Sequence, residues 1–285
     1  IFEAWIVSSM VCNMFMNFFN IIGNAFCIFI LKMGVEGVAI PTFLARLSGA
    51  CFIMWMLAHT RQESSLQSIK DILPQKEIAG RILNIGVPNS FESGIFQFGR
   101  VFLQSLVSTL GTASIAGYAV ASNLVQYLYL PGNALGAALL TVVGQCYGAD
   151  EKKQAKQYVK RFLFFNYAML LFICTVMIFG RNFFVGMYHL SGESSVMAVR
   201  LLVSHALAMI LWPMAFLTPY YFRAIGKARF TMVVSITIMW IFRVGFAYLF
   251  VKVFHTTVLG IWIAMYIDWV VRVIIYLITF RRIRV

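Results

Sequence analysis

Six polar side chains recur on one face of the otherwise apolar segment 82–108. Their spacing of three or four residues is that of one face of an α-helix: Asn89, Ser93, Gln97, Arg100, Gln104 and Ser108. Glu92 lies beside this face. An ionisable side chain near the middle of a bilayer costs about 2.5–3.5 kcal/mol or more, so we expect this face to border a wet cavity or a partner. Two interpretations of Glu92 stay open: a carboxylate that alternately takes up a proton or a sodium ion, or a fixed ion pair with Arg100.

Further ionisable residues lie deep in other apolar segments. Asp268 and Arg272 are four residues apart, so they are expected to face each other on a helix. A structural ion pair and a coupling or gating role both remain open for this pair, and Asp268 joins Glu92 as a candidate coupling residue. Arg243 is a second ion-pair or gating candidate, and Arg46 is also deep. Because deep arginines outnumber deep acids, either acids on other helices balance them or the cavity accepts anionic groups.

Segments 115–146 and 196–222 combine polar side chains with prolines. The polar residues, which we assign to a substrate cavity together with those of 82–108, are Asn123, Gln126, Tyr127, His205 and Tyr220. The prolines are Pro131, Pro213 and Pro219. A proline inside a membrane helix frees a backbone carbonyl and bends the helix, so each is a candidate hinge or a static kink. His205 is either a buried contact between helices or a proton carrier.

The elements that must position these side chains are membrane helices. Of the 285 residues, 61% are hydrophobic and only 12% are charged, whereas soluble domains have about 25% charged residues. A crossing needs about 20 apolar residues. Eight runs are predicted to cross: 7–31, 35–58, 82–108, 115–146, 161–180, 196–222, 230–252 and 258–280. The fold class is therefore an all-α membrane protein with eight transmembrane helices.

The lysines and arginines indicate the orientation of the chain. Fifteen lie in the links after the second, fourth and sixth runs and in the C-terminal tail, against three in the other links. Because cytoplasmic loops keep positive residues, the C-terminus and the 59–81 and 147–160 links are expected in the cytoplasm. The short loops favour the cell inner (plasma) membrane. The net charge of +13 is explained in this way without nucleic acid as a partner. The five cysteines have no metal-ligand spacing, so we expect no metal site.

A weak internal repeat suggests how the chain is organised. The segment beginning at Met10 matches the one beginning at Met232, and Gly23 meets Gly245 at the same offset of 222 residues. We therefore predict that 1–58 holds the last two helices of an N-terminal lobe, 59–81 an inter-lobe linker, and 82–285 a complete C-terminal lobe of six helices. The sequence is expected to begin inside the N-terminal lobe.

Four stretches resemble one known family. Residues 85–156, which include IGVPNSFESGIFQFGR, resemble the start of the C-terminal lobe of multidrug and toxic compound extrusion (MATE) transporters. YFRAIGKARFTM at 221–232, WIFRVGFAYL at 240–249 and GIWIAMYIDWVVR at 260–272 resemble the last helices of that lobe. Roughly the first four helices of the family have no counterpart here. The resemblance implies two six-helix lobes and a coupling role for Glu92, because the family often has a glutamate in this helix.

The resemblance also implies a function. We expect a secondary active transporter, working as a monomer among membrane lipid, that exports small organic, often cationic, drug-like compounds by proton- or sodium-coupled antiport and alternating access. No cofactor is expected besides the coupling ion. The alternative is a flippase for lipid-linked or polysaccharide substrates, whose phosphates would suit the deep arginines. An enzyme is not expected, because the sequence has no HExxH, GxSxG or nucleotide-binding loop.

Overall fold

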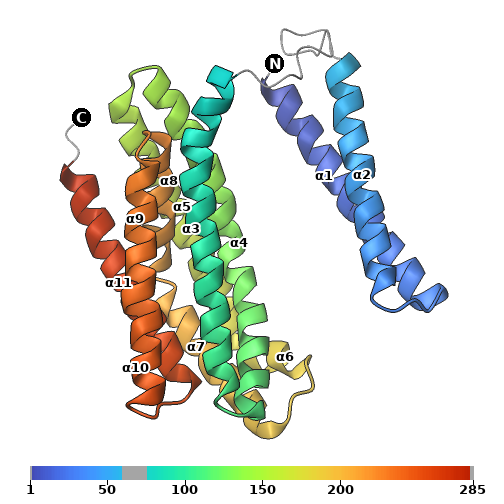
Figure 1. The fold of residues 1–285 in the computed structure, drawn as a ribbon, viewed down its shortest axis with the longest axis vertical. Helices are drawn as coiled ribbons and strands as arrows, with labels where there is room; N and C mark the ends of the chain where they lie inside the picture. The colour runs from blue at the N-terminus through green and yellow to red at the C-terminus, as the bar shows by residue number, and fades with distance from the viewer. Residues whose placement is uncertain (1, 60–75, 283–285) are drawn as a thin grey trace. The chain divides into compact units, whose positions relative to one another are not determined.

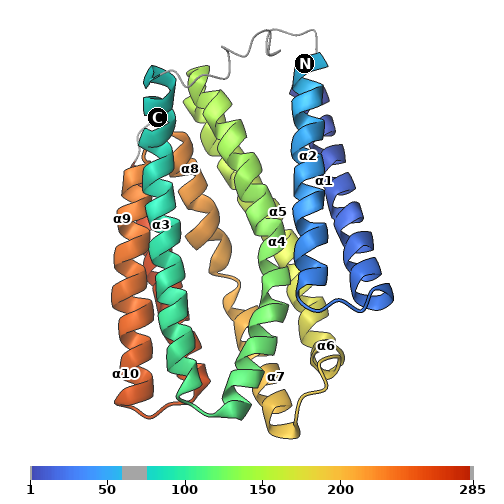
Figure 2. The ribbon, with the colours of Figure 1, turned by 45° about the vertical axis from the view of Figure 1, so that its right-hand side comes forward.

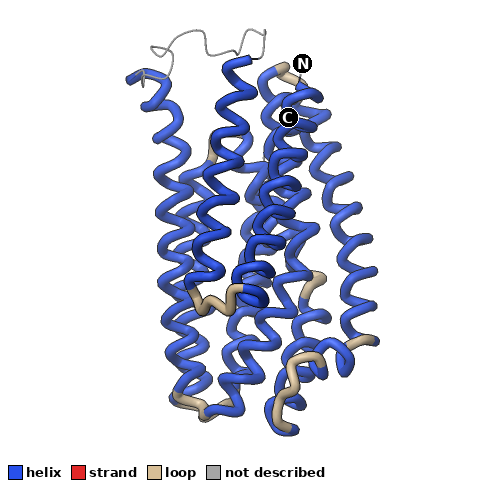
Figure 3. The backbone as a smooth tube through the Cα atoms, turned by 90° about the vertical axis from the view of Figure 1, so that its right-hand side faces the viewer, coloured by secondary structure: helices blue, strands red, loops and turns tan. Residues whose placement is uncertain are grey.

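The computed structural model describes residues 2–59 and 76–282, whose regular structure is helical throughout (Figure 3). The helices, with η marking π-helical segments, are α1 (Phe2–Ala25), η1 (Phe26–Ile30), α2 (Glu36–His59), α3 (Lys76–Ser108), α4 (Thr112–Gly148), α5 (Lys152–Phe179), α6 (Arg181–Gly186), α7 (Gly192–Ala208), η3 (Pro213–Leu217), α8 (Thr218–Ala224), α9 (Ala228–Ile238), η4 (Met239–Gly245), α10 (Phe246–Lys252) and α11 (Val258–Arg282). Helices suit a bilayer because each satisfies its own backbone hydrogen bonds. The predicted all-α fold is confirmed.

The chain forms two compact units that divide between Ala79 and Gly80. In the first unit, α1 and α2 lie side by side as a helical hairpin (Figure 1). Asn20 donates a hydrogen bond of 2.9 Å to Thr42 across this hairpin. Gly23 leaves no room for a side chain beside Pro41, which is how small residues let membrane helices approach closely.

The second unit is built around α4 and α11. Helix α4 packs against α5 and α7 (Figure 2), and also against α8, whereas α11 packs against α10, η4 and η3. Buried apolar side chains from α3, α4, α5, α7, α10 and α11 form the main core, in which Leu128, Leu201 and Trp269 are almost fully buried. A smaller apolar cluster around Tyr221 and Tyr276 joins α4, α5, α8 and α11.

The outer surface of the helices is apolar. On α5, Phe164, Leu171 and Phe172 each expose 70% or more of their area. Six helical spans in the described residues are long and apolar enough to cross a membrane, and a seventh results if α7 and η3–α8 count as one bent span. Helix α3 has 33 residues, but its polar stripe lowers its hydropathy and it is not among these spans. The exact count of eight crossings therefore stays a prediction.

Several helices extend beyond the predicted crossings, whose boundaries in the membrane stay predictions. Helix α5 begins at Lys152, nine residues before the predicted crossing, because the basic residues of 152–161 favour helix and extend it beyond the apolar run. Helix α3 likewise begins at Lys76, inside the predicted 59–81 linker, of which 60–75 lie outside the described residues. The short helix α6 was not predicted.

The predicted crossing 196–222 is broken. Helix α7 ends at Ala208, and the chain resumes at Pro213 with a bend of 67°. Pro213 has no backbone N–H, and its ring clashes with the carbonyl four residues earlier, which favours a break of the helix at this point. The predicted crossing 230–252 is continuous but contains the π-helical segment η4, which no periodicity in the sequence reveals.

Candidate functional site

A cavity of about 350 Å³ lies within the second unit, among α3, α4, α7, η3, η4 and α11. Nearly half of its lining residues are aromatic: Phe96, Tyr118, Tyr129, Trp212, Phe216, Trp262 and Trp269, together with the imidazole of His205. Its polar lining residues are Arg100, Ser122, Gln126, Asn133 and Arg243. This volume falls in the range of sites for small organic molecules.

Local irregularities of the helices shape this wall. Gly132 of α4 lies against the ring of Trp212, with no space for a Cβ, so a glycine is needed for the indole to pack there. Phe216 comes from η3 and Arg243 from η4, the two π-helical segments of the second unit. A π-helical turn shifts the direction of the following side chains relative to an α-helix, and such turns are frequent at functional sites.

His205 is buried, with 1% of its area exposed, and lies among aromatic rings. The hydroxyl of Tyr129 lies 2.8 Å from its Nε2 atom. The edges of Trp262 and Trp269 approach the imidazole at centroid distances of 5.0 and 5.2 Å. Its Nδ1 atom has no partner among the described residues. This environment makes His205 a contact between helices that also borders the cavity.

The two arginines of the cavity have no carboxylate partner in the described part of the chain. The Nη2 atom of Arg243 donates to the sulfur of Met265 at 3.0 Å, a weak acceptor. Its guanidinium lies 5.6 Å from the ring centre of Phe96, and its buried Nε has no partner among the described residues. The positive charge of the cavity is therefore uncompensated by any neighbouring acid that the structure describes.

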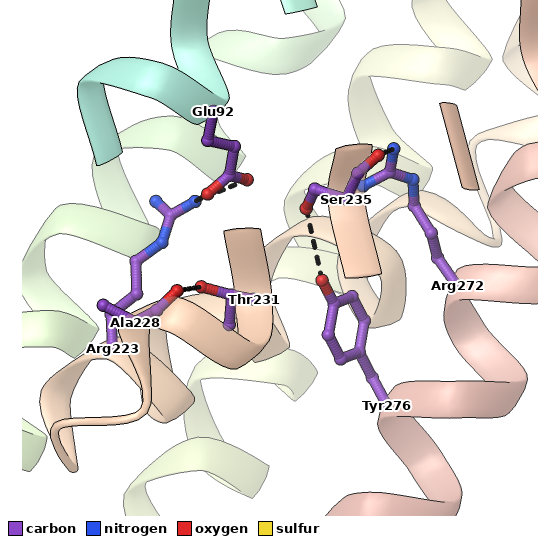
Figure 4. A network of polar contacts seen from close by, with 7 residues as sticks. All are labelled: Glu92, Arg223, Ala228, Thr231, Ser235, Arg272 and Tyr276. Atoms are coloured by element: carbon purple, nitrogen blue, oxygen red, sulfur yellow. Dashed lines mark hydrogen bonds and ion pairs between the residues drawn. The ribbon is translucent and has the colours of Figure 1, made fainter. Parts of the chain in front are cut away.

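A smaller cavity of about 100 Å³ adjoins the first, since Phe96, Asn133 and Phe216 line both. Its charged lining residues are Glu92, Arg223 and Arg272. The Nη2 atom of Arg223 donates to both carboxylate oxygens of Glu92 at 2.9 Å (Figure 4).

The alternative that Glu92 pairs with Arg100 is wrong. Arg100 lies two helical turns away, about 12 Å along α3, and lines the larger cavity instead. Arg223 was missed because the sequence places it in a basic cluster after the sixth run. No spacing rule connects residues 131 positions apart.

The expected contact between Asp268 and Arg272 is present. The Nε atom of Arg272 donates to Asp268 Oδ1 at 2.9 Å, and both side chains are buried. Arg272 also donates to the backbone oxygen of Ser235 at 2.9 Å, which ties α11 to α9 (Figure 4). The hydroxyl of Tyr276 lies 3.3 Å from that of Ser235, while Thr231 donates to the carbonyl of Ala228 beside them.

The structure divides the predicted site residues into three groups. The larger cavity is lined by Arg100, Gln126, His205 and Arg243, and the smaller by Glu92, Pro219, Tyr220 and Arg272. Outside both cavities, on exposed surface of the second unit, lie Asn89, Ser93, Gln97, Gln104, Ser108, Asn123 and Tyr127. Asp268 lines neither cavity and is hydrogen-bonded to Arg272. The sequence did not point to Arg223, Asn133 or the aromatic wall, because aromatic residues fill apolar helices everywhere in this chain.

The prolines have different structural roles. Pro131 lies within the continuous helix α4. Pro213 begins η3 at the 67° bend, and Pro219 lies in the first turn of α8. Arg46 is exposed on α2 in the first unit. Among the described residues no cluster of histidine, cysteine and acidic side chains could hold a metal ion.

Residues 88–249, more than half of the chain, match the family model MatE. The chain belongs to the MatE family. It is 24% identical over 237 residues to the probable multidrug resistance protein YoeA of Bacillus subtilis, covering 81% of this chain and 50% of YoeA. It is also 24% identical over 245 residues to the probable multidrug resistance protein NorM of Thermotoga maritima, covering 85% of this chain and 52% of NorM.

A solved structure shares the fold of this MatE chain. The outward-facing conformation of a multidrug resistance MATE family transporter of the MOP superfamily is 23% identical, with a TM-score of 0.85, over 95% of this chain and 61% of that one. This MatE chain spans about half the length of the curated relatives it matches. With its apolar spans, the family places it among multi-pass membrane transporters and not among enzymes.

Proposed function

We propose that this MatE chain serves a secondary active transporter that exports drug-like organic compounds by cation-coupled antiport. The observation that carries the proposal is the cavity of about 350 Å³ inside a unit of the MatE fold, with a partly buried ion pair in the adjoining smaller cavity. Transport by alternating access requires a binding site deep in the membrane whose surroundings rearrange. Export takes place across the cell inner (plasma) membrane, with the C-terminus in the cytoplasm and the protein working as a monomer in lipid.

Glu92 is the proposed coupling carboxylate. In the structure its charge is balanced by Arg223, whose side chain comes from a different helix. A proton or a sodium ion that takes the place of Arg223 would break the only ion pair of Glu92 in the described residues. Helix α8 is then free to move relative to α3, which is a two-state change of the kind that coupling requires. Asp268 is the second candidate, but Arg272 holds it within α11 itself.

Hinges for the movement are proposed at the prolines. The break between α7 and η3 already leaves backbone groups outside a regular helix, so rotation there disrupts few hydrogen bonds. Arg223 lies on α8, directly after this break and after Pro219. A change of bend at Pro213 would therefore move Arg223 relative to Glu92.

A flippase is the second candidate, favoured by the arginines. Four arginines and one glutamate line the two cavities, and arginine binds phosphate in a fork geometry. The cavity volume suits one small organic molecule better than a lipid-linked saccharide.

The surface of α3 that carries Ser93, Gln97 and Gln104 is uncovered in the second unit. Polar side chains of this kind favour a wet path over contact with lipid.

The test is transport by the intact protein reconstituted in liposomes. A panel of fluorescent aromatic compounds of either charge is loaded, and efflux is followed after a proton or sodium gradient is imposed. Glu92→Gln is expected to abolish gradient-driven efflux while expression stays intact, because the amide cannot exchange Arg223 for a cation. Glu193→Gln, an exposed glutamate in the first turn of α7, is the matched control. Unchanged efflux in Glu92→Gln would remove Glu92 from the mechanism, and movement of a lipid-linked substrate alone would favour the flippase.

A further inference from the structure

We propose that the larger cavity binds the anionic group of a soluble aromatic organic acid through Arg100 and Arg243. This inference rests on the proposed function, because it names the class of compound that the transporter accepts. It replaces the cationic substrate expected from the family resemblance. The ligand class follows from three features of the cavity: its charge, its unpaired hydrogen-bond donors and its aromatic wall.

The charge of the cavity is positive. Arg100 and Arg243 line it, whereas no acidic side chain does. The nearest acids that the structure describes are already bound: Glu92 to Arg223 and Asp268 to Arg272. Removing a charge from water is costly unless an opposite charge or hydrogen bonds compensate for it. A bound carboxylate, sulfonate or phosphate would provide that compensation for the half-buried Arg243 and would pair with the exposed Arg100, whereas a cation would add repulsion.

The unpaired polar groups around the cavity are mainly donors. The Nε of Arg243 and the Nε1 of Trp269 are buried, and neither has a hydrogen-bond partner in the described residues. Both residues line the cavity, and an N–H at these positions can only donate. Native proteins leave few buried polar groups without partners. These two atoms are themselves closed off from the cavity space, so the other N–H groups of the Arg100 and Arg243 guanidiniums are the donors available to a ligand rich in acceptors. An anionic oxygen group is the strongest acceptor of this kind.

The aromatic wall specifies the body of the ligand. Three of the six tryptophans of the chain, Trp212, Trp262 and Trp269, line the cavity. Trp212 is stacked with Tyr129 and with Phe216, at centroid distances of 5.7 and 5.3 Å. Flat rings pack well against such faces in offset or edge contacts. Aromatic faces also attract cations, but here two arginines occupy the same space and oppose a second positive charge.

The decisive experiment compares three ligands that share a naphthalene ring and carry a negative, neutral or positive group at the same position. Naphthalene-2-carboxylate, naphthalene-2-carboxamide and naphthalen-2-ylmethylammonium are titrated into the intact protein in a neutral detergent. Binding is measured by isothermal titration calorimetry, with quenching of tryptophan fluorescence as a second readout. The carboxylate is expected to bind at least about tenfold more tightly than the ammonium, with the amide between them. Equal or tighter binding of the ammonium overturns the proposal without reference to any variant.

Variants then locate the site. Arg243→Gln and Arg100→Gln are each expected to weaken carboxylate binding about tenfold or more, since each removes a cation from the ligand. Arg243→Lys keeps the charge and is expected to retain part of the affinity, which separates loss of charge from loss of fold. Arg200→Gln, an exposed arginine of α7 outside both cavities, is the matched control. Carboxylate affinity that is the same in all four variants overturns the assignment.

Two further measurements distinguish a soluble organic acid from a lipid headgroup, and this inference from the proposed function. Addition of phosphatidylglycerol to the micelles tests whether a lipid headgroup is the true anion: displacement of naphthalene-2-carboxylate would overturn the choice of a soluble acid, and unchanged affinity supports it. The binding measurement needs no gradient. Carboxylate binding without gradient-driven transport would therefore refute only the proposed function, whereas coupled transport of cations with no carboxylate binding would refute only this inference.

Discussion

The guanidinium of Arg223 on α8 holds the carboxylate of Glu92 on α3 with two hydrogen bonds of 2.9 Å, across 131 residues of sequence. The side chains expose 22% and 13% of their area, so the pair is only partly shielded from solvent. The guanidinium also lies 5.5 Å from the ring centre of Tyr220, which holds it over the smaller cavity. This pair is the contact between α3 and α8 that a coupling ion would have to break.

The first prediction concerns the strength of this pair. Glu92→Gln, Arg223→Gln and the double variant are expected to form a cycle with a coupling of about 1–3 kcal/mol in the free energy of unfolding, the range for hydrogen bonds to charged groups. Partial exposure keeps the value below that of a fully buried pair. Unfolding by SDS in mixed micelles measures it. The ion pair of Lys152 with Asp150 is the control, because both side chains are largely exposed and no measurable coupling is expected.

The second prediction concerns Asp268 and Arg272, which are buried on the same helix. Arg272→Gln leaves the carboxylate of Asp268 buried without its cation, and we expect a loss of about 3–5 kcal/mol in unfolding free energy. Adding Asp268→Asn to this variant is expected to recover part of the loss, because the uncompensated charge is gone. A double variant that is less stable than Arg272→Gln alone would contradict this account, and the same SDS titration decides it.

Much of the fold could be predicted because the bilayer imposes a simple rule on apolar segments. The hydrophobic runs matched the helices α1, α2, α4, α5 and α11 to within several residues at most ends. The break at Pro213 was recognised as a possible bend, but its angle of 67° depends on packing that the sequence does not display. Helix starts such as Lys152 were missed, since hydropathy stops at the membrane surface and a helix does not.

The candidate site could be predicted less well. Residues that are unusual in membrane helices, such as Arg100, Arg243 and Glu92, were found because a deep charge is conspicuous in any apolar run. The pairing of Glu92 with Arg223 was not predicted, because it depends on how α3 and α8 pack against each other. Of the predicted polar face that carries Ser93 and Gln97, only Arg100 lines the larger cavity, next to Phe96 and Leu103 of the same helix. Periodicity in a sequence shows which residues share one face of a helix, but it does not show what packs against that face.

The third prediction concerns Tyr129, whose hydroxyl bonds the Nε2 atom of the buried His205 at 2.8 Å. Tyr129→Phe removes the one partner of the imidazole in the described residues, so we expect a loss of about 1–3 kcal/mol in unfolding free energy. Tyr266→Phe is the matched control. Its hydroxyl lies 3.0 Å from that of Ser204, which also donates to the carbonyl of Leu201 and keeps a partner. Equal losses in both variants would show that His205 gains nothing specific from Tyr129.

The fourth prediction tests the glycines of α4 that shape the cavities. A Cβ at Gly132 would meet the ring of Trp212, and a Cβ at Gly136 would meet the ring of Tyr220. Each ring would have to shift away from α4 and lose its present packing, so Gly132→Ala and Gly136→Ala are each expected to cost about 1–3 kcal/mol of unfolding free energy through overpacking. Gly132→Ala should also weaken ligand binding in the larger cavity, because the displaced indole of Trp212 takes up its space.

Gly144 of the same helix is the control for both substitutions, because nothing lies within 4 Å of the position that its Cβ would take. At Gly144 an alanine only reduces the conformational freedom of the unfolded chain, so we expect the free energy of unfolding to rise by about 0.4–1 kcal/mol. The opposite signs within one helix separate packing against the rings from helix propensity, since propensity alone would make all three substitutions stabilising. If Gly132→Ala were as stable as Gly144→Ala, Trp212 would not be held against α4 as the structure shows.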